Sequence, residues 1–86
     1  MALDKDQAAL LQAIGANVRR LRIEADLTQE KLAELVGINP RTVQKIEAGK
    51  LNILVTTFSR IQGALGCQAD QLLPAPKRSG KKTKGE

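Results

Sequence analysis

A short stretch of the chain holds side chains whose hydrogen-bonding groups suit the edges of nucleic-acid bases. Arginine and lysine can donate to O6 and N7 of guanine, and glutamine can bond to N6 and N7 of adenine. Threonine can contact a thymine methyl group or a phosphate. The candidates are Arg41, Thr42, Gln44 and Lys45. Arg41 is the first choice for a base contact because it lies nearest the start of a predicted helix. For each of them, the alternative is a solvated helix face.

Other polar residues flank this stretch and suit phosphate groups better than bases. Gln29 begins a predicted helix, where unpaired N–H groups and the side-chain amide can hold a phosphate. The further candidates for phosphate contacts are Thr28, Asn39, Lys50 and Asn52. For Gln29 the alternative is an exposed helix-start residue without a ligand.

Two short helices joined by a tight turn must position these side chains. Thr28 is the expected N-cap of the first helix, and Gly37 suits a chain that leaves it through a left-handed conformation. Asn39 then caps a second helix, 40–48, and Pro40 takes its first position, where the missing N–H of proline costs nothing. The first helix has an expected apolar face of Leu32, Leu35 and Val36.

Small and apolar residues stand where two steeply crossing helices need them. Ala33 has almost no side chain at the expected crossing point, and Ile38 fills the gap behind the turn. Val43 and Ile46 are expected to seal the second helix onto its neighbours. The alternative is an ordinary helical hairpin that packs for stability alone.

Three further helices are predicted around this pair. Residues 8–25 repeat apolar side chains every three or four positions, with Asp4 and Asp6 as candidate caps. Gly15 inside that pattern marks either a close helix contact or a weak point. A helix over 53–65 is expected to bury Val55, Phe58, Ile61 and Leu65, and a short helix over about 68–73 offers Leu72 and Leu73. Residues 1–73 are therefore predicted to form one all-α, compact five-helix domain.

The composition removes most enzyme and metal chemistry. The chain has no histidine and one cysteine, so the usual general base and the usual metal-ligand clusters are missing, and no metal or cofactor is expected. Because a nucleophile–base pair and a phosphate-cradling glycine loop are also missing, an enzyme is not expected. The single cysteine, Cys67, is expected to be a small buried apolar residue. Without a signal peptide or an apolar run of roughly 20 residues, the expected location is the cytoplasm, with no membrane partner.

Positive charge is concentrated at the C-terminus. The net charge is +5, and residues 77–86 hold five basic residues and one acidic residue, which leaves +1 for residues 1–73. Residues 74–86 are expected to be a disordered basic tail, because Pro74 and Pro76 end the apolar pattern. Such a tail is attracted to polyphosphate without reading its sequence, or it serves only as a solubilising end. The charge run alone does not decide between these two interpretations.

Residues 17–73 resemble the phage-repressor helix-turn-helix family, the Cro/CI or Xre-like group. The resemblance rests on Val18-Arg19-Arg20-Leu21-Arg22, Leu27-Thr28-Gln29-Glu30-Lys31-Leu32-Ala33, Gly37-Ile38, Val43-Gln44-Lys45-Ile46-Glu47-Ala48-Gly49-Lys50, and Ala64-Leu65-Gly66 with Leu72-Leu73. It implies a lambda-repressor-like bundle that acts as a homodimer on operator DNA, with helix 40–48 in the major groove of a palindrome. It also implies that Gln29 clamps a phosphate, and that Arg22 forms a structural ion pair with Glu47.

The sequence departs from the family pattern in two places. Pro40 stands where many relatives have a glutamine or serine that reads a base, which shifts the expected reading toward Arg41. An apolar run follows the second helix, where relatives are often polar. We hypothesise that Leu51, Ile53 or Leu54 contributes to a dimer contact, the alternative being that all of them fold under the bundle.

Three functions stay open on the sequence. The first is a sequence-specific transcriptional regulator, with repression favoured because so small a domain has no evident activation surface. The second is an antitoxin that binds a toxin protein and represses their shared operon, which a neighbouring toxin gene would favour. The third is a protein-interaction bundle without DNA binding, which Pro40 slightly supports and which Gln29, Arg41 and Lys45 argue against.

Overall fold

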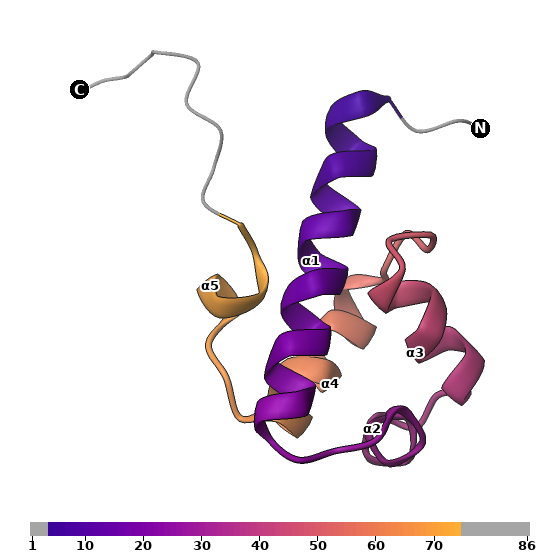
Figure 1. The fold of residues 1–86 in the computed structure, drawn as a ribbon, viewed down its shortest axis with the longest axis vertical. Coiled ribbons are helices and arrows are strands. Elements are labelled where there is room, and N and C mark those ends of the chain that lie inside the picture. Colours follow the sequence, from indigo (N-terminus) through magenta and orange to yellow (C-terminus); the bar gives the residue numbers. More distant parts are fainter. Residues whose placement is uncertain (1–3, 75–86) are drawn as a thin grey trace.

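Five helices and no strands make up residues 4–74, the part of the chain that the structure, a computed structural model, describes (Figure 1). The helices are α1 (Lys5–Glu24), α2 (Gln29–Val36), α3 (Pro40–Glu47), α4 (Val55–Leu65) and α5 (Ala69–Leu72). The predicted all-α, five-helix fold is confirmed. The predicted basic tail lies outside the described residues from position 75 onward. None of the described helices combines the length and the apolar character that a membrane crossing requires.

Side-chain caps set the start of the first three helices. The Asp4 carboxylate accepts a hydrogen bond from the Gln7 backbone N–H at 2.8 Å, so α1 begins at Lys5, three residues earlier than the apolar pattern predicts. Thr28 Oγ1 accepts from the Lys31 N–H at 2.9 Å, and Asn39 Oδ1 accepts from the Arg41 N–H at 2.8 Å. Between α2 and α3, Gly37 has φ 84°, the left-handed conformation that the sharp turn requires.

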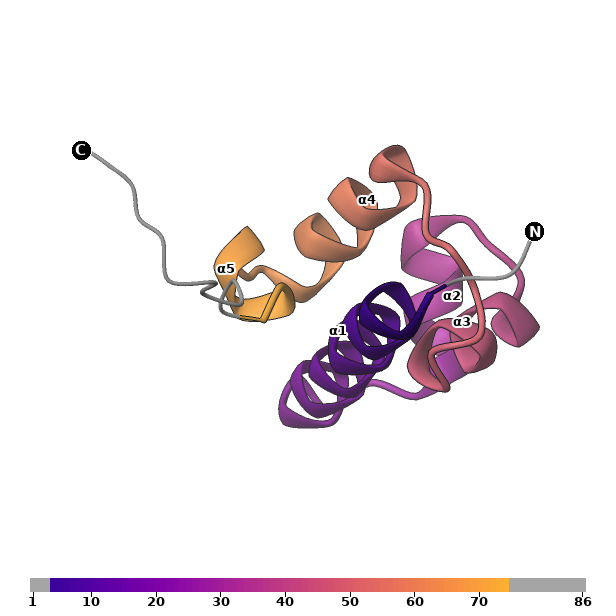
Figure 2. The same cartoon turned by 90° about the horizontal axis from the view of Figure 1, so that it is seen from above.

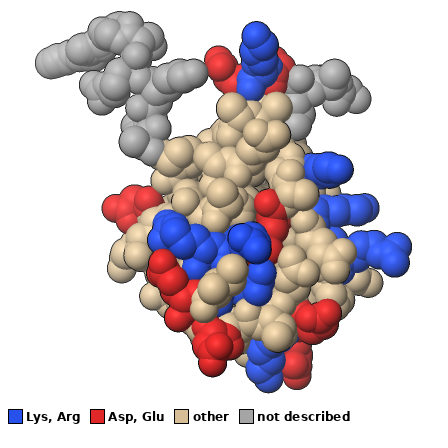
Figure 3. Space-filling view, viewed as in Figure 1, with Lys and Arg blue, Asp and Glu red and all other residues tan. Residues whose placement is uncertain are grey.

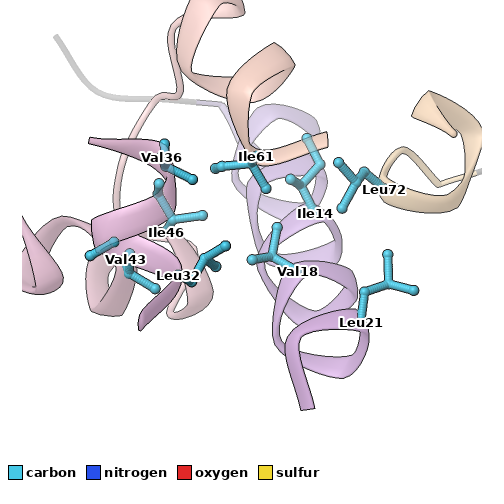
Figure 4. Close-up of a cluster of buried hydrophobic side chains, with 10 residues drawn as sticks. Ile14, Val18, Leu21, Leu32, Val36, Val43, Ile46, Ile61 and Leu72 are labelled. Carbon is cyan, nitrogen blue, oxygen red and sulfur yellow. The ribbon is translucent and has the colours of Figure 1, made fainter. Parts of the chain in front are cut away.

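The core lies between α1 and the other four helices. In Figures 1 and 2, α2 and α3 lie on one side of α1 and α5 lies on the other, while α4 bridges the two sides. Figure 4 shows the buried side chains meeting between these elements, namely Ile14, Val18, Leu21, Leu32, Val36, Val43, Ile46, Ile61 and Leu72. Burying one such side chain contributes about 1.5–3 kcal/mol, so this aliphatic cluster fixes the position of α3.

Two residues predicted to be apolar core are exposed. Val55, the first residue of α4, is 82% exposed, whereas Phe58 and Ile61 further along the same helix pack in the core. Leu35 is 52% exposed although it follows the buried Leu32 by three residues, because the buried side of α2 is centred between Leu32, Ala33 and Val36 and Leu35 lies at its edge. The helix predicted over 53–65 begins only at Val55.

The C-terminal end of α3 rests directly on the backbone of α1 at Gly15. A Cβ atom built on Gly15 would collide with the carbonyl oxygen of Ile46 and would lie 2.8 Å from that of Glu47. Gly15 therefore marks a close helix contact, the first of the two interpretations of this glycine. The position leaves no room for a side chain.

Candidate nucleic-acid interface

One face of α3 is buried and the opposite face is exposed. Val43 and Ile46 are each 1% exposed and hold the helix on the core. Arg41, Gln44 and Lys45 are all exposed, and their spacings of three and four residues place them on one helix face. Thr42 is half-buried at the flank of this face. The structure therefore brings three of the four candidate base contacts together on a surface that solvent can reach.

Basic side chains gather along the edge of the molecule that carries α3. Figure 3 shows lysine and arginine side chains projecting on the right-hand side, where α3 and the loop after it lie in Figure 1. Lys50 and Asn52 are exposed in that loop. A row of positive groups beside an exposed polar helix face suits a negatively charged, extended ligand.

The two helix-start residues proposed for phosphate contacts use their side-chain oxygens as caps. Thr28 Oγ1 and Asn39 Oδ1 accept hydrogen bonds from the first turns of α2 and α3. Capping leaves the hydroxyl hydrogen of Thr28 and the amide nitrogen of Asn39 as donors. Both residues are exposed, so these donors face solvent.

A buried ion pair joins α1 to the last residue of α3. Arg22 Nε lies 2.6 Å from Glu47 Oε2, and Arg22 Nη2 donates to Glu47 Oε1 at 3.2 Å. The third donor, Arg22 Nη1, binds the carbonyl oxygen of Leu27 at 2.7 Å. The two side chains are only 10% and 4% exposed. This bidentate ion pair fixes the orientation of the last turn of α3 relative to α1.

Gln29 also contacts Glu47, and no pattern in the sequence predicts this contact. Its amide nitrogen Nε2 donates to Glu47 Oε1 at 2.9 Å. The side chain is half-buried, so it is more than an exposed helix-start residue. Arg22, Gln29 and Glu47 thus form one network that spans α1, the start of α2 and the end of α3.

Two further polar contacts, also missed at the sequence level, hold the outer helices. Arg60 Nη1 on α4 donates to the carbonyl oxygen of Val36 at 3.3 Å, at the end of α2. Asn17 Nδ2 on α1 donates to the carbonyl oxygen of Leu72 at 2.8 Å. Each joins a side chain to a backbone carbonyl far away in the sequence, and no local pattern signals such a contact. Both support the elements around the α2–α3 pair.

The apolar run after α3 divides into covered and uncovered residues. Leu51 and Ile53 are half-buried and pack against the core. Leu54 is 70% exposed and Val55 is 82% exposed, side by side where α4 begins. Of the three residues proposed for a dimer contact, only Leu54 is therefore largely free of the core.

Cys67 lies outside this interface, directly after Gly66, the C-cap of α4. It is half-buried and packs against the core cluster. Desolvation by burial raises the pKa of its thiol above the ordinary value. A raised pKa keeps the side chain neutral, as expected for a small apolar core residue.

A short helix pair with a left-handed glycine at its turn, whose second helix exposes a polar face, defines a helix-turn-helix domain. The chain belongs to the HTH_3 helix-turn-helix family, whose family model matches residues 18–72. The predicted resemblance to the Cro/CI or Xre-like group is confirmed.

Relatives of this chain are described as regulators of transcription. This chain is 37% identical over 65 residues to the uncharacterised HTH-type transcriptional regulator y4mF of Sinorhizobium fredii. The aligned residues cover 76% of this chain and 86% of the relative. The restriction-modification controller protein C.AhdI from Aeromonas hydrophila is 30% identical, with a TM-score of 0.71 over 73% of this chain and 96% of its own. The hypothetical transcription factor NHTF from Neisseria is also 30% identical, with a TM-score of 0.74 over 88% of this chain and 87% of its own.

Proposed function

We propose that this chain binds double-stranded DNA at specific sequences and regulates transcription, with α3 lying in the major groove. One observation carries the proposal: Arg41, Gln44 and Lys45 share the exposed face of a helix whose opposite face is locked into the core. An α-helix fits the major groove, and these side-chain types match base edges there. The regulatory relatives support the same function.

We further propose that the chain acts as a homodimer that represses transcription from a palindromic operator. A two-fold axis would place two copies of α3 in successive major grooves on one side of the duplex, with half-sites about 10 base pairs apart. The phosphate contacts would come from the starts of α2 and α3 and from the loop after α3: Thr28, Gln29, Asn39, Lys50 and Asn52. The exposed apolar residues Leu54 and Val55 are the candidate dimer contact.

Arg41→Ala is expected to weaken binding to the selected operator and to relax its preference at one base pair of each half-site. A bidentate arginine–guanine contact contributes about 1–3 kcal/mol of discrimination, which is about 5- to 150-fold in affinity. The measurement is selection from a randomised duplex library, followed by titration of the selected site and its single-base variants. Lys50→Ala is the matched control, because loss of a phosphate contact weakens all sequences alike and lowers the salt dependence.

Loss of sequence-specific binding would contradict the proposed role of α3. If the unmodified protein recovers no motif, and its weak binding loses its salt dependence when residues 77–86 are deleted, then the tail alone holds DNA. That outcome would contradict the proposed role of α3 and would favour a protein-interaction bundle.

Leu54→Asp is expected to convert the dimer to a monomer without unfolding it. The side chain is 70% exposed in the single chain, so the change leaves the core intact. In a dimer contact, the new carboxylate would lose its water shell without gaining a partner, which is strongly unfavourable. Light scattering measures the mass, and Ile23→Asp is the control, since Ile23 is 51% exposed on α1, away from this segment. An unchanged dimer would exclude Leu54 from the interface and would leave it for another protein, as the antitoxin alternative requires.

A further inference from the structure

We infer that Glu47 is a positioning residue for DNA binding: it orients the Gln29 side-chain amide so that one of its N–H groups points at a backbone phosphate. Arg22 supports this role because its positive charge neutralises the Glu47 carboxylate. The inference rests on the proposed function and deepens it, since it assigns the buried network of Arg22, Gln29 and Glu47 a part in binding.

The carboxylate decides which way the amide faces. An ionised carboxylate only accepts hydrogen bonds, so the nitrogen of the Gln29 amide, and not its oxygen, must face Glu47 Oε1 across the 2.9 Å separation. The amide nitrogen carries two hydrogens, and Glu47 takes one. The other hydrogen is left as a donor at the first residue of α2, where the helix dipole also attracts an anion.

A carboxylate this close to a phosphate would ordinarily oppose DNA binding. Here Arg22 Nε and Nη2 engage both Glu47 oxygens, and the two side chains are almost fully buried. The pair presents no net charge to a phosphate, yet the carboxylate still accepts the Gln29 hydrogen bond. Without that acceptor, the amide can turn over and direct its oxygen at the phosphate, where two acceptors repel each other.

The first experiment is a double-mutant cycle on DNA affinity, using the duplex selected by the unmodified protein. Gln29→Ala is expected to lower affinity about 10-fold when Glu47 is present, the size of one hydrogen bond to a charged group. In the Glu47→Gln background, the same change is expected to lower affinity less than about twofold, which is within the ordinary scatter of independent sites. Such coupling would not arise if Glu47 acted only on folding, because the affinities are compared between folded proteins.

Glu34→Gln is the control for the loss of one negative charge. Removing a negative charge should strengthen binding to DNA, and Glu34→Gln, at a side chain that is 71% exposed, is expected to do so slightly or to have no effect. Glu47→Gln removes the same charge and is expected to weaken binding. The opposite signs separate amide positioning from general electrostatics.

A second experiment uses the unmodified protein, so it decides the inference even if Glu47→Gln does not fold. The two Gln29 amide hydrogens are followed by NMR, assigned by their absence in Gln29→Ala, while the selected duplex is added. One resonance is expected to shift on binding and to lose that shift when a single backbone phosphate is replaced by a neutral methylphosphonate. The other resonance is expected to stay at its free-protein position.

The outcomes separate this inference from the proposed function. The role of Glu47 would be overturned if the affinity losses of Gln29→Ala and Glu47→Gln were additive. It would also be overturned if no methylphosphonate substitution changed the chemical shift of either Gln29 amide hydrogen. Neither result would affect base reading by Arg41. An unmodified protein that selects no duplex would instead overturn the proposed function itself.

Discussion

Gly15→Ala is expected to lower the free energy of unfolding by about 3 kcal/mol, the upper end of the usual penalty for overpacking. The added methyl group would collide with the Ile46 carbonyl oxygen and press on that of Glu47. These are backbone atoms at the end of α3, so they move only if α3 moves and strains the Arg22–Glu47 contact. For a domain of this size, the change should lower the melting temperature by about 15 °C, measured by circular dichroism.

Gly63→Ala is the matched control, because the same change is made inside a helix with open space around it. Nothing lies within 4 Å of a Cβ built on Gly63 in α4. Here only the helix propensity of alanine counts, and the free energy of unfolding is expected to rise by about 0.5–1 kcal/mol. Equal stabilities for the two variants would contradict the close approach of α3 to α1.

Helix boundaries were predictable where a cap acts through a local hydrogen bond. Thr28 and Asn39 bond to N–H groups two or three residues away, so their types alone indicate where α2 and α3 begin. Gly37 ends α2 through its own backbone conformation. The exposed face of α3 also follows from the sequence, because Val43 and Ile46 assign the opposite face to the core.

Burial was harder to predict, because periodicity shows which residues share a face but not whether another helix covers it. Val55 lies three residues before Phe58 and so continues its stripe, yet Phe58 packs against the core while Val55 is 82% exposed. The same limit applies to Leu35. Which of two apolar neighbours is covered depends on how helices cross, and that is a property of the assembled chain.

The polar network shows a second limit. The Arg22–Glu47 pairing was expected from the family resemblance, since residues 25 positions apart carry no local signal of contact. The Gln29–Glu47 hydrogen bond was not expected at all. The contact forms because the fold brings the start of α2 and the end of α3 together beside Arg22. The sequence therefore predicted the residues of the site but not the contact between Gln29 and Glu47.

Arg22→Met is expected to lower the free energy of unfolding by about 3–5 kcal/mol, the range for breaking a buried ion pair. Methionine keeps much of the length and volume of the side chain, so little packing is lost. The Glu47 carboxylate, 4% exposed, would keep only the Gln29 hydrogen bond, and the Leu27 carbonyl oxygen would lose its Arg22 donor. Urea denaturation followed by circular dichroism measures the loss.

Lys31→Met tests whether burial, and not charge pairing as such, produces this effect. Lys31 and Glu34 lie 3.4 Å apart, but their side chains are 53% and 71% exposed, so breaking the pair should change stability by less than about 0.5 kcal/mol. Adding Glu47→Leu to Arg22→Met should restore part of the lost stability, since the uncompensated charge is gone. If Arg22→Met and Lys31→Met were equally stable, the ion pair would not be what holds α3 against α1, and the orientation of the exposed helix face would depend on the aliphatic core alone.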